Sequence, residues 1–156
     1  CVHGCKHMWQ SLSWSIDVAT LLERHPDLDW DSVFSQCGAE DLRRIIYLGL
    51  NVACSVVDAR VPPEILKRSR QDSAAAALAR QVKAELFQHK GERGGMRFIR
   101  FQCRMKSRRI DAARFCLRTL SNPSLTEGRG VIQYLAYPFY LTSRLFRRRS
   151  PSTFRP

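Results

Sequence analysis

Residues 40–57 read Glu40-Asp-Leu-Arg-Arg-Ile-Ile-Tyr-Leu-Gly-Leu-Asn-Val-Ala-Cys-Ser-Val-Val57, and this stretch decides the fold class. Apolar side chains recur on one face at the period of an α-helix, at Ile45, Leu48, Val52 and Val56. Two acidic residues stand in the first turn, where the helix dipole favours negative charge. The sequence therefore predicts a helix over this whole stretch.

The segments on either side carry helix signals as well. Prolines and glycines mark the expected ends, and Asp29 or Asp31 and Asp72 are expected to cap helix starts. The further predicted helices cover about residues 3–24, 29–36, 63–69, 73–88, 96–120 and 131–147, the last bent at Pro138. No segment keeps the alternation typical of a strand. We predict an all-α fold, a helical bundle of about five to seven helices.

Charge is divided unevenly along the 156 residues. Residues 1–66 carry five Lys/Arg and nine Asp/Glu, a net charge of −4, whereas residues 67–156 carry twenty-one and five, a net charge of +16. We predict an acidic helical subdomain over residues 1–90, a basic helical segment over 91–148 and a disordered tail over 149–156, with the joint at Gly91–Gly95. A cationic half is suited to an anionic partner, although a solvated basic surface would look the same.

The cysteines and the absence of long apolar runs indicate the compartment. The six cysteines form no C-x-x-C pair, and most fall on apolar helical faces, which favours buried free thiols over a disulfide framework. No run approaches the roughly 20 apolar residues that span a bilayer, so we expect no transmembrane segment. The first residues show no secretory signal pattern. We expect a cytoplasmic protein.

The first predicted helix has two contrasting faces. One sector carries polar and aromatic groups, His3, Lys6, His7, Gln10, Trp14 and Asp17. The opposite sector is apolar and contains Cys5, Met8, Trp9, Leu12, Ile16 and Ala19. Imidazole and ammonium groups are suited to phosphate or carboxylate contacts. The alternative is a packing or interface role, with Asp17 simply paired to Lys6.

Two metal-site readings are disfavoured. His3 and His7 are four residues apart, a spacing that can bind a metal, and Cys1 and Cys5 have the same spacing. The two pairs point to different sectors of the helix, so they cannot form one tetrahedral site. The Asp-x-Asp pairs at residues 27–31 follow a proline at a helix start, so we interpret them as caps. We therefore predict no metal ligands in this chain.

The string His3-Gly-Cys-Lys-His7-x-Trp9-x-x-Leu12-x-Trp14-x-x-Asp17 resembles the signature of a family of uncharacterised bacterial nucleotidyltransferases of the polymerase-β-like superfamily. The following His25-Pro-Asp-Leu-Asp-Trp30 is also similar to that family. The resemblance is strong over residues 1–60 and weak beyond Gly91. It implies the helical C-terminal region of an α+β enzyme that transfers a nucleoside monophosphate from an NTP to an acceptor.

The resemblance also implies Mg²⁺ bound by carboxylates on a small sheet after a Gly-Ser turn. This sequence has no matching Gly-Ser and Asp-x-Asp motif, so we expect the metal centre in a missing N-terminal catalytic part, or absent altogether. Mg²⁺ and NTP are then cofactors of the full-length protein, and none is bound by this fragment alone. We assign catalysis to no residue here. Lys6 and one histidine are expected to contact triphosphate or acceptor, with Asp17 orienting them.

A row of arginines supports a second hypothesis from another functional class. Arg97, Arg100, Arg104 and Arg108 share one face of the predicted basic helix, and guanidinium groups in a row can follow phosphates. The alternative function is therefore a non-catalytic basic helical module that binds an anionic partner, either nucleic acid or an acidic protein. No recognised nucleic-acid-binding motif is present.

Overall fold

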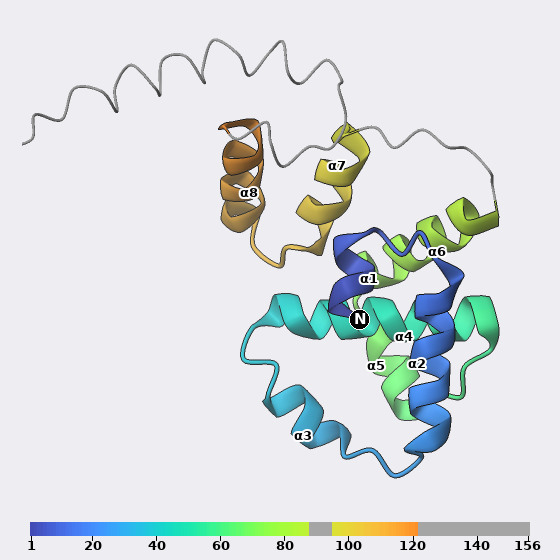
Figure 1. The fold of residues 1–156 in the computed structure, drawn as a ribbon. Coiled ribbons are helices and arrows are strands. Elements are labelled where there is room, and N and C mark those ends of the chain that lie inside the picture. Colours follow the sequence, from blue (N-terminus) through green and yellow to red (C-terminus); the bar gives the residue numbers. More distant parts are fainter. Residues whose placement is uncertain (88–94, 122–156) are drawn as a thin grey trace, which may run out of the picture.

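The computed structural model describes residues 1–87 and 95–121, and this part of the chain is all-α, as predicted. Its eight helices slightly exceed the expected number (Figure 1). They are α1 (Val2–Lys6), α2 (Leu12–Arg24), α3 (Trp30–Ser35), α4 (Glu40–Val57), α5 (Pro63–Gln71), α6 (Ser73–Phe87), α7 (Gly95–Met105) and α8 (Arg109–Ser121). The predicted helix over residues 131–147 and the predicted tail over 149–156 lie outside the described residues.

Helix α4 is the centre of the fold, and α1, α2, α5, α6 and α7 all contact it (Figure 1). Six consecutive α4 residues, from Leu48 to Ala53, are buried, so this helix is enclosed on all sides at its middle. Its one buried polar side chain in that stretch, Asn51, donates to the Ser69 carbonyl at 3.0 Å and accepts from the Ser69 hydroxyl at 3.2 Å. The predicted boundaries of α4 are confirmed.

The predicted aspartate caps are confirmed at Asp29 and Asp72. Asp29 accepts a hydrogen bond from the Ser32 amide at 3.0 Å and so caps α3. Asp72 accepts from the amides of Ala74 and Ala75 at 3.1 and 3.0 Å and so caps α6. Asp72 also binds the Arg44 guanidinium at 2.9 Å, which ties the start of α6 to α4. These carboxylates therefore serve helix ends, as the sequence indicated.

The prediction of one continuous helix over residues 3–24 is wrong. The chain leaves the helix after Lys6 and starts α2 only at Leu12. The Trp9 amide donates to the Gly4 carbonyl at 2.7 Å, and the Met8 amide donates to the Cys5 carbonyl at 3.3 Å. This pair of bonds is the Schellman motif, with Met8 in the left-handed conformation at φ 53° where glycine is the usual residue.

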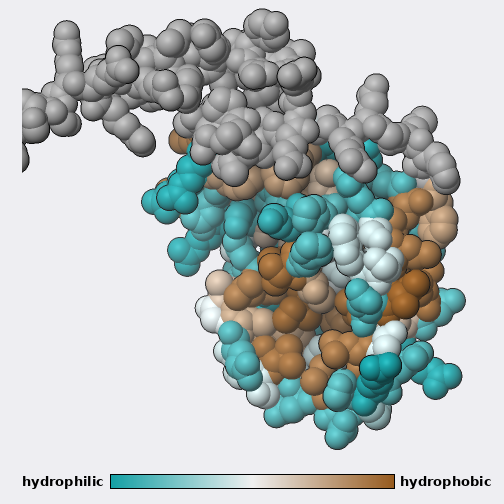
Figure 2. Space-filling view, in the orientation of Figure 1, coloured by the Kyte–Doolittle hydropathy of each residue, from teal (hydrophilic) through white to brown (hydrophobic). Residues whose placement is uncertain are grey.

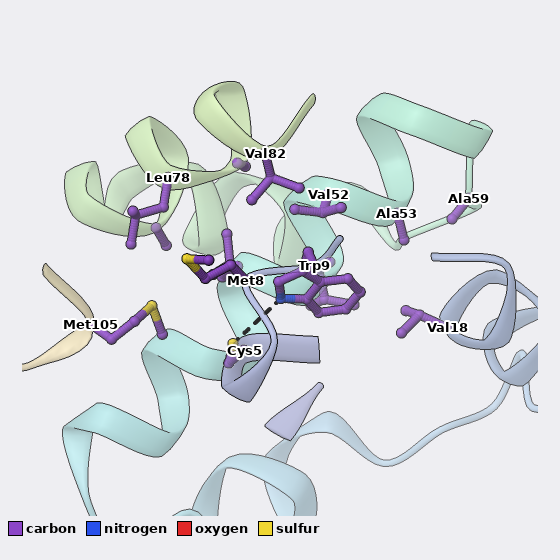
Figure 3. Close-up of a cluster of buried hydrophobic side chains, with 14 of the residues drawn as sticks. Cys5, Met8, Trp9, Val18, Val52, Ala53, Ala59, Leu78, Val82 and Met105 are labelled. Atoms are coloured by element: carbon purple, nitrogen blue, oxygen red, sulfur yellow. Dashed lines mark hydrogen bonds between the residues drawn. The ribbon is translucent and has the colours of Figure 1, made fainter. Parts of the chain in front are cut away.

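Burial of Trp9 explains why the chain turns at a position with no glycine. The indole is only 1 % exposed and donates from Nε1 to the Cys5 sulfur at 3.4 Å. It lies within the apolar cluster that α1, α2, α4 and α6 build together (Figure 3). Two glycines make room for it: a Cβ on Gly4 would lie 2.7 Å from an indole carbon, and one on Gly49 would lie 3.1 Å away.

The free energy gained by burying the indole exceeds the cost of the backbone conformation in the turn. Left-handed conformations at Met8 and Trp9 cost about 1–2 kcal/mol each. Burying an indole of roughly 200 Å² stabilises by about 5 kcal/mol at about 25 cal/mol per Å². The burial term outweighs the backbone term. We call the segment from Gly4 to Trp9 the Trp9 corner.

The apolar face assigned to residues 12–19 is wrong in part, because that face assumed a straight helix. Leu12 and Ile16 are 45 % and 48 % exposed. The buried residues of α2 are instead Ser15, Val18 and Leu22. Figure 2 shows one face of the molecule, with apolar side chains in its middle and hydrophilic residues around them.

The prediction of one basic helix over residues 96–120 is also wrong. The chain breaks between α7 and α8, and side chains of α4 bind the break. Asp41 accepts from the Ser107 amide at 2.7 Å and from the Lys106 ammonium at 3.2 Å. Arg44 donates to the Lys106 carbonyl at 2.7 Å. These contacts satisfy backbone groups that the broken helix would otherwise leave unpaired.

Helix α7 packs directly on the N-terminal helices. Its Phe101 and Met105 belong to the same buried cluster as the residues of α1, α4 and α6. Gln102 donates to the Cys5 carbonyl at 2.9 Å, which links α7 to the Trp9 corner. The basic segment thus shares its core with the acidic one.

The sign of the change in folding stability caused by Gly4→Ala tests the Trp9 corner. Alanine in place of a helical glycine usually stabilises by about 0.5–1 kcal/mol. Here we expect a loss of about 1–3 kcal/mol, because the new methyl group would overlap the indole. Urea denaturation followed by circular dichroism measures it.

The matched control is Gly4→Ala in a Trp9→Leu background, where the overlap is gone. There the substitution is expected to be neutral or stabilising, since the two residues then no longer interact. A stabilising effect of Gly4→Ala in the parent chain would contradict the Trp9 corner.

Asp41→Asn tests the break between α7 and α8. Burial of Asp41 acts to raise its pKa, but the Ser107 hydrogen bonds and the Lys106 charge outweigh it, and the pKa falls below its ordinary value of 3.8. The folded state therefore binds this proton less readily than the unfolded state. Asp41 stabilises the fold above that ordinary value, and the contribution is lost as the pH falls through the folded-state pKa.

We expect Asp41→Asn to lower the free energy of unfolding by about 1–2 kcal/mol at pH 7. Because the contribution of the carboxylate disappears in acid, the difference between the two proteins should shrink at pH 3. Chemical denaturation at both pH values measures it. A difference that stayed constant, or that grew in acid, would contradict the assignment.

Candidate functional site

Three aromatic rings from α1 and α2 meet on the surface beside the Trp9 corner. The ring centroids of His3 and His7 are 4.7 Å apart, and they lie 5.3 and 5.7 Å from that of Trp14. Both imidazoles are exposed and the indole is half-buried. We call these three residues the imidazole–indole cluster. They were predicted to share a face of one helix, and they meet although that helix is broken.

The other predicted members of the polar stripe do not join this cluster by a contact. Lys6, Gln10 and Asp17 are all exposed. Within residues 1–87 and 95–121, the ion pairs of the structure do not involve Lys6 or Asp17. The alternative that Asp17 serves as a partner for Lys6 is therefore not what the structure shows. Lys6 follows the first imidazole by less than one helical turn, so its charge lies close to the cluster.

The family-like string divides into an internal and an external set of residues. Gly4, Cys5 and Trp9 are buried and build the corner. Burial raises the pKa of the Cys5 thiol to about 11, with the Trp9 hydrogen bond and the N-terminal charge opposing it, so this thiol is protonated at neutral pH. The external set consists of His3, Lys6, His7, Trp14 and Asp17. The internal set thus positions the external one.

The external surface is chemically suited to anions. Imidazole nitrogens can donate hydrogen bonds to phosphate oxygens, and a lysine ammonium supplies a compact positive charge. An indole face can stack on a base or cover a ring. The described residues contain no group of three or more His, Cys, Asp or Glu side chains that could hold a metal ion. The exposed side chains of this surface are therefore suited to a phosphate-bearing ligand.

The structure distributes the four predicted arginines differently from a continuous row. Arg97 forms an ion pair with Glu85, and Arg104 donates to Gln81 at 3.4 Å. Arg108 follows the end of α7 and lies in the turn before α8. Arg100 is exposed on α7. The charge of Arg97 is therefore already compensated from within the fold.

Two hollows were not anticipated from the sequence. One, of about 500 Å³, is lined by Leu22, Glu23, His25, Pro26, Trp30, Arg60, Val61 and Pro62. The other, of about 540 Å³, is lined by Glu40, Arg43, Arg44, Tyr47, Gln71, Asp72 and Ser73. Neither includes a residue of the imidazole–indole cluster. Each lining comes from two segments that are distant in sequence, so no local motif could have revealed it.

Comparison with known proteins finds a match in the N-terminal part of the chain. The model of a family described as "Uncharacterised nucleotidyltransferase" matches residues 1–58. This match runs from α1 through the end of α4 and so contains the Trp9 corner and the imidazole–indole cluster. No curated protein and no solved structure matches the chain. Within the described residues, no helix combines the length and the apolar character needed to cross a membrane.

Proposed function

We propose that this chain is the helical part of a nucleotidyltransferase-like protein that transfers an NMP from an NTP to an acceptor, and that the imidazole–indole cluster with Lys6 faces the triphosphate or the acceptor. The observation that carries the proposal is the meeting of His3, His7 and Trp14 on one surface of the nucleotidyltransferase-matched segment. Buried residues of the same segment fix that surface in place.

Several features of the surface support binding of a phosphate group. Lys6 has no ion-pair partner among the described residues, so its charge is free to meet a ligand. The two imidazoles are exposed and close enough for both to reach one phosphate group. Asp17 lies one turn after Trp14 on α2, where its carboxylate can accept a hydrogen bond from an imidazole or from the acceptor. Binding and orientation are the roles these residues can perform.

The metal chemistry belongs elsewhere in this proposal. Mg²⁺ would neutralise charge developing on the phosphates and is held by carboxylates. The described residues contain no group of three or more His, Cys, Asp or Glu that could hold a metal ion. We assign those carboxylates to an N-terminal catalytic part of the full-length protein. A protein that uses NTP and contains six free thiols is suited to the cytoplasm.

The chain alone is accordingly expected to lack transfer activity. Incubation with Mg²⁺ and an NTP radiolabelled at the α-phosphate, with total cell RNA, protein and small metabolites as acceptors, should yield no labelled product. Formation of a Mg²⁺-dependent labelled product by the purified 156-residue chain would contradict the placement of the metal centre.

Lys6→Ala and His7→Ala test the binding surface directly. Each removes a charged or polar hydrogen-bond donor to phosphate, and such bonds contribute about 1.5–3 kcal/mol, so we expect affinity for a fluorescent ATP analogue to fall about tenfold or more. Fluorescence anisotropy on the whole chain measures it. Lys67→Ala is the matched control, because Lys67 is an exposed lysine on α5 that leaves the cluster intact.

Arg100→Ala separates this proposal from the alternative of a basic binding module. If the imidazole–indole cluster and Lys6 bind the nucleotide, Arg100→Ala should leave ATP affinity unchanged. The alternative predicts that it weakens binding of single-stranded RNA, whereas Lys6→Ala does not. Failure of the chain to bind the ATP analogue, or equal affinity in the parent, Lys6→Ala and His7→Ala proteins, would contradict the nucleotide surface.

A further inference from the structure

Two cysteines that no part of the proposed nucleotide surface uses are in direct contact. The sulfur atoms of Cys103 on α7 and Cys116 on α8 lie 3.0 Å apart. A disulfide bond is about 2.05 Å long, so about 1 Å of approach would join them. All six cysteines of the chain are described, and the other four sulfurs have no such neighbour. The pair therefore differs from the cysteines that serve packing.

Contacts of neighbouring residues hold Cys103 and Cys116 close together. The turn between α7 and α8 is bound to α4 by Asp41 and Arg44. The rings of Phe98 and Phe115 pack across the same two helices, with their centroids 6.3 Å apart. The two thiols are consequently held near one another by contacts that do not depend on a bond between them, so little ordering remains for disulfide closure to impose.

Exposure and charge favour reaction with a small anionic reagent. Both cysteines are half-buried, whereas Cys5 and Cys37 are buried. Lys106 and the exposed Arg104 place positive charge near Cys103. Positive charges near a thiol attract anions. Glutathione disulfide, which carries net negative charge, is a reagent of this kind.

We propose that Cys103 and Cys116 form a reversible dithiol–disulfide site that closes on exchange with a low-molecular-weight disulfide and covalently joins α7 to α8. The joined residues are thirteen apart in sequence, so the bond closes a short loop. Gln102, the residue before Cys103, donates to the Cys5 carbonyl. The oxidised site therefore fixes the helix that contacts the Trp9 corner.

The exchange proceeds in two balanced steps. Burial, together with the hydrogen bond and charge of Cys116, raises the pKa of Cys103 to about 11. We assign the first attack to Cys116 and the second to Cys103. The Cys116 thiolate attacks one sulfur of glutathione disulfide, which forms a mixed disulfide and releases one glutathione. Cys103 then loses its proton and attacks the Cys116 sulfur, which releases the second glutathione. Two protein thiols are oxidised and one glutathione disulfide is reduced.

Oxidation of the whole folded chain with glutathione disulfide tests the proposal. After alkylation of the remaining thiols, the free thiol content should fall by two of six. Tryptic digestion should yield the peptide of residues 101–104 joined to that of residues 115–118, and dithiothreitol should separate them. The Cys103→Ser protein should instead accumulate a mixed disulfide with glutathione on Cys116.

Cys54→Ser is the matched control, because Cys54 is also half-buried but has no neighbouring thiol, and it should leave closure unchanged. Circular dichroism of each variant confirms that the helices are retained. Glutathione attached only to Cys1 or Cys54, or a disulfide between any other pair, would overturn the proposal. An equal loss of two free thiols in the Cys103→Ser protein would also overturn the proposal.

Discussion

The burial of one indole governs the arrangement of the N-terminal helices. Trp9 is enclosed by the helices that meet at α4, and it reaches that position only because the chain turns after Lys6. Gly4 and Gly49 lack the side chains that would occupy the same space. The turn then places α1 against α4 and leads into α2, which also packs on α4. The surface cluster of two histidines and Trp14 is a consequence of that turn, because its members come from the two helices that the turn joins.

The sequence was sufficient to predict the helices that are defined by local signals. The central helix, its boundaries and the aspartate caps follow from apolar periodicity and from capping chemistry, both of which act within a few residues. The two helix breaks could not be predicted in this way, because neither has a glycine or proline at the turn. One depends on burial of Trp9, and the other on Asp41 and Arg44, which lie more than sixty residues before the break. Both causes are tertiary.

The candidate site shows the same division. The polar residues of the stripe were predicted from spacing, and three of them meet. His3 in α1 and the C-cap residue His7 are one turn apart, and Trp14 lies at the start of α2. Their support was predicted only in part. Cys5, Met8 and Trp9 are buried, as the apolar sector indicated, but a straight helix would also have placed Leu12 and Ile16 in the core. The basic row was predicted from spacing as well, but Glu85 and Gln81 bind two of its arginines from a neighbouring helix. Pairing across helices is not visible in a local pattern.

The central claim is that the Trp9 corner assembles the surface cluster, and nuclear Overhauser contacts between side-chain rings test it most directly. In the parent chain, the ring protons of His3 and His7 should show contacts to the indole protons of Trp14. In a folded Trp9→Leu chain, the corner loses the group that holds it closed, and these contacts should weaken or vanish while those between Phe98 and Phe115 persist. Full retention of the histidine–Trp14 contacts in the Trp9→Leu chain would contradict the account.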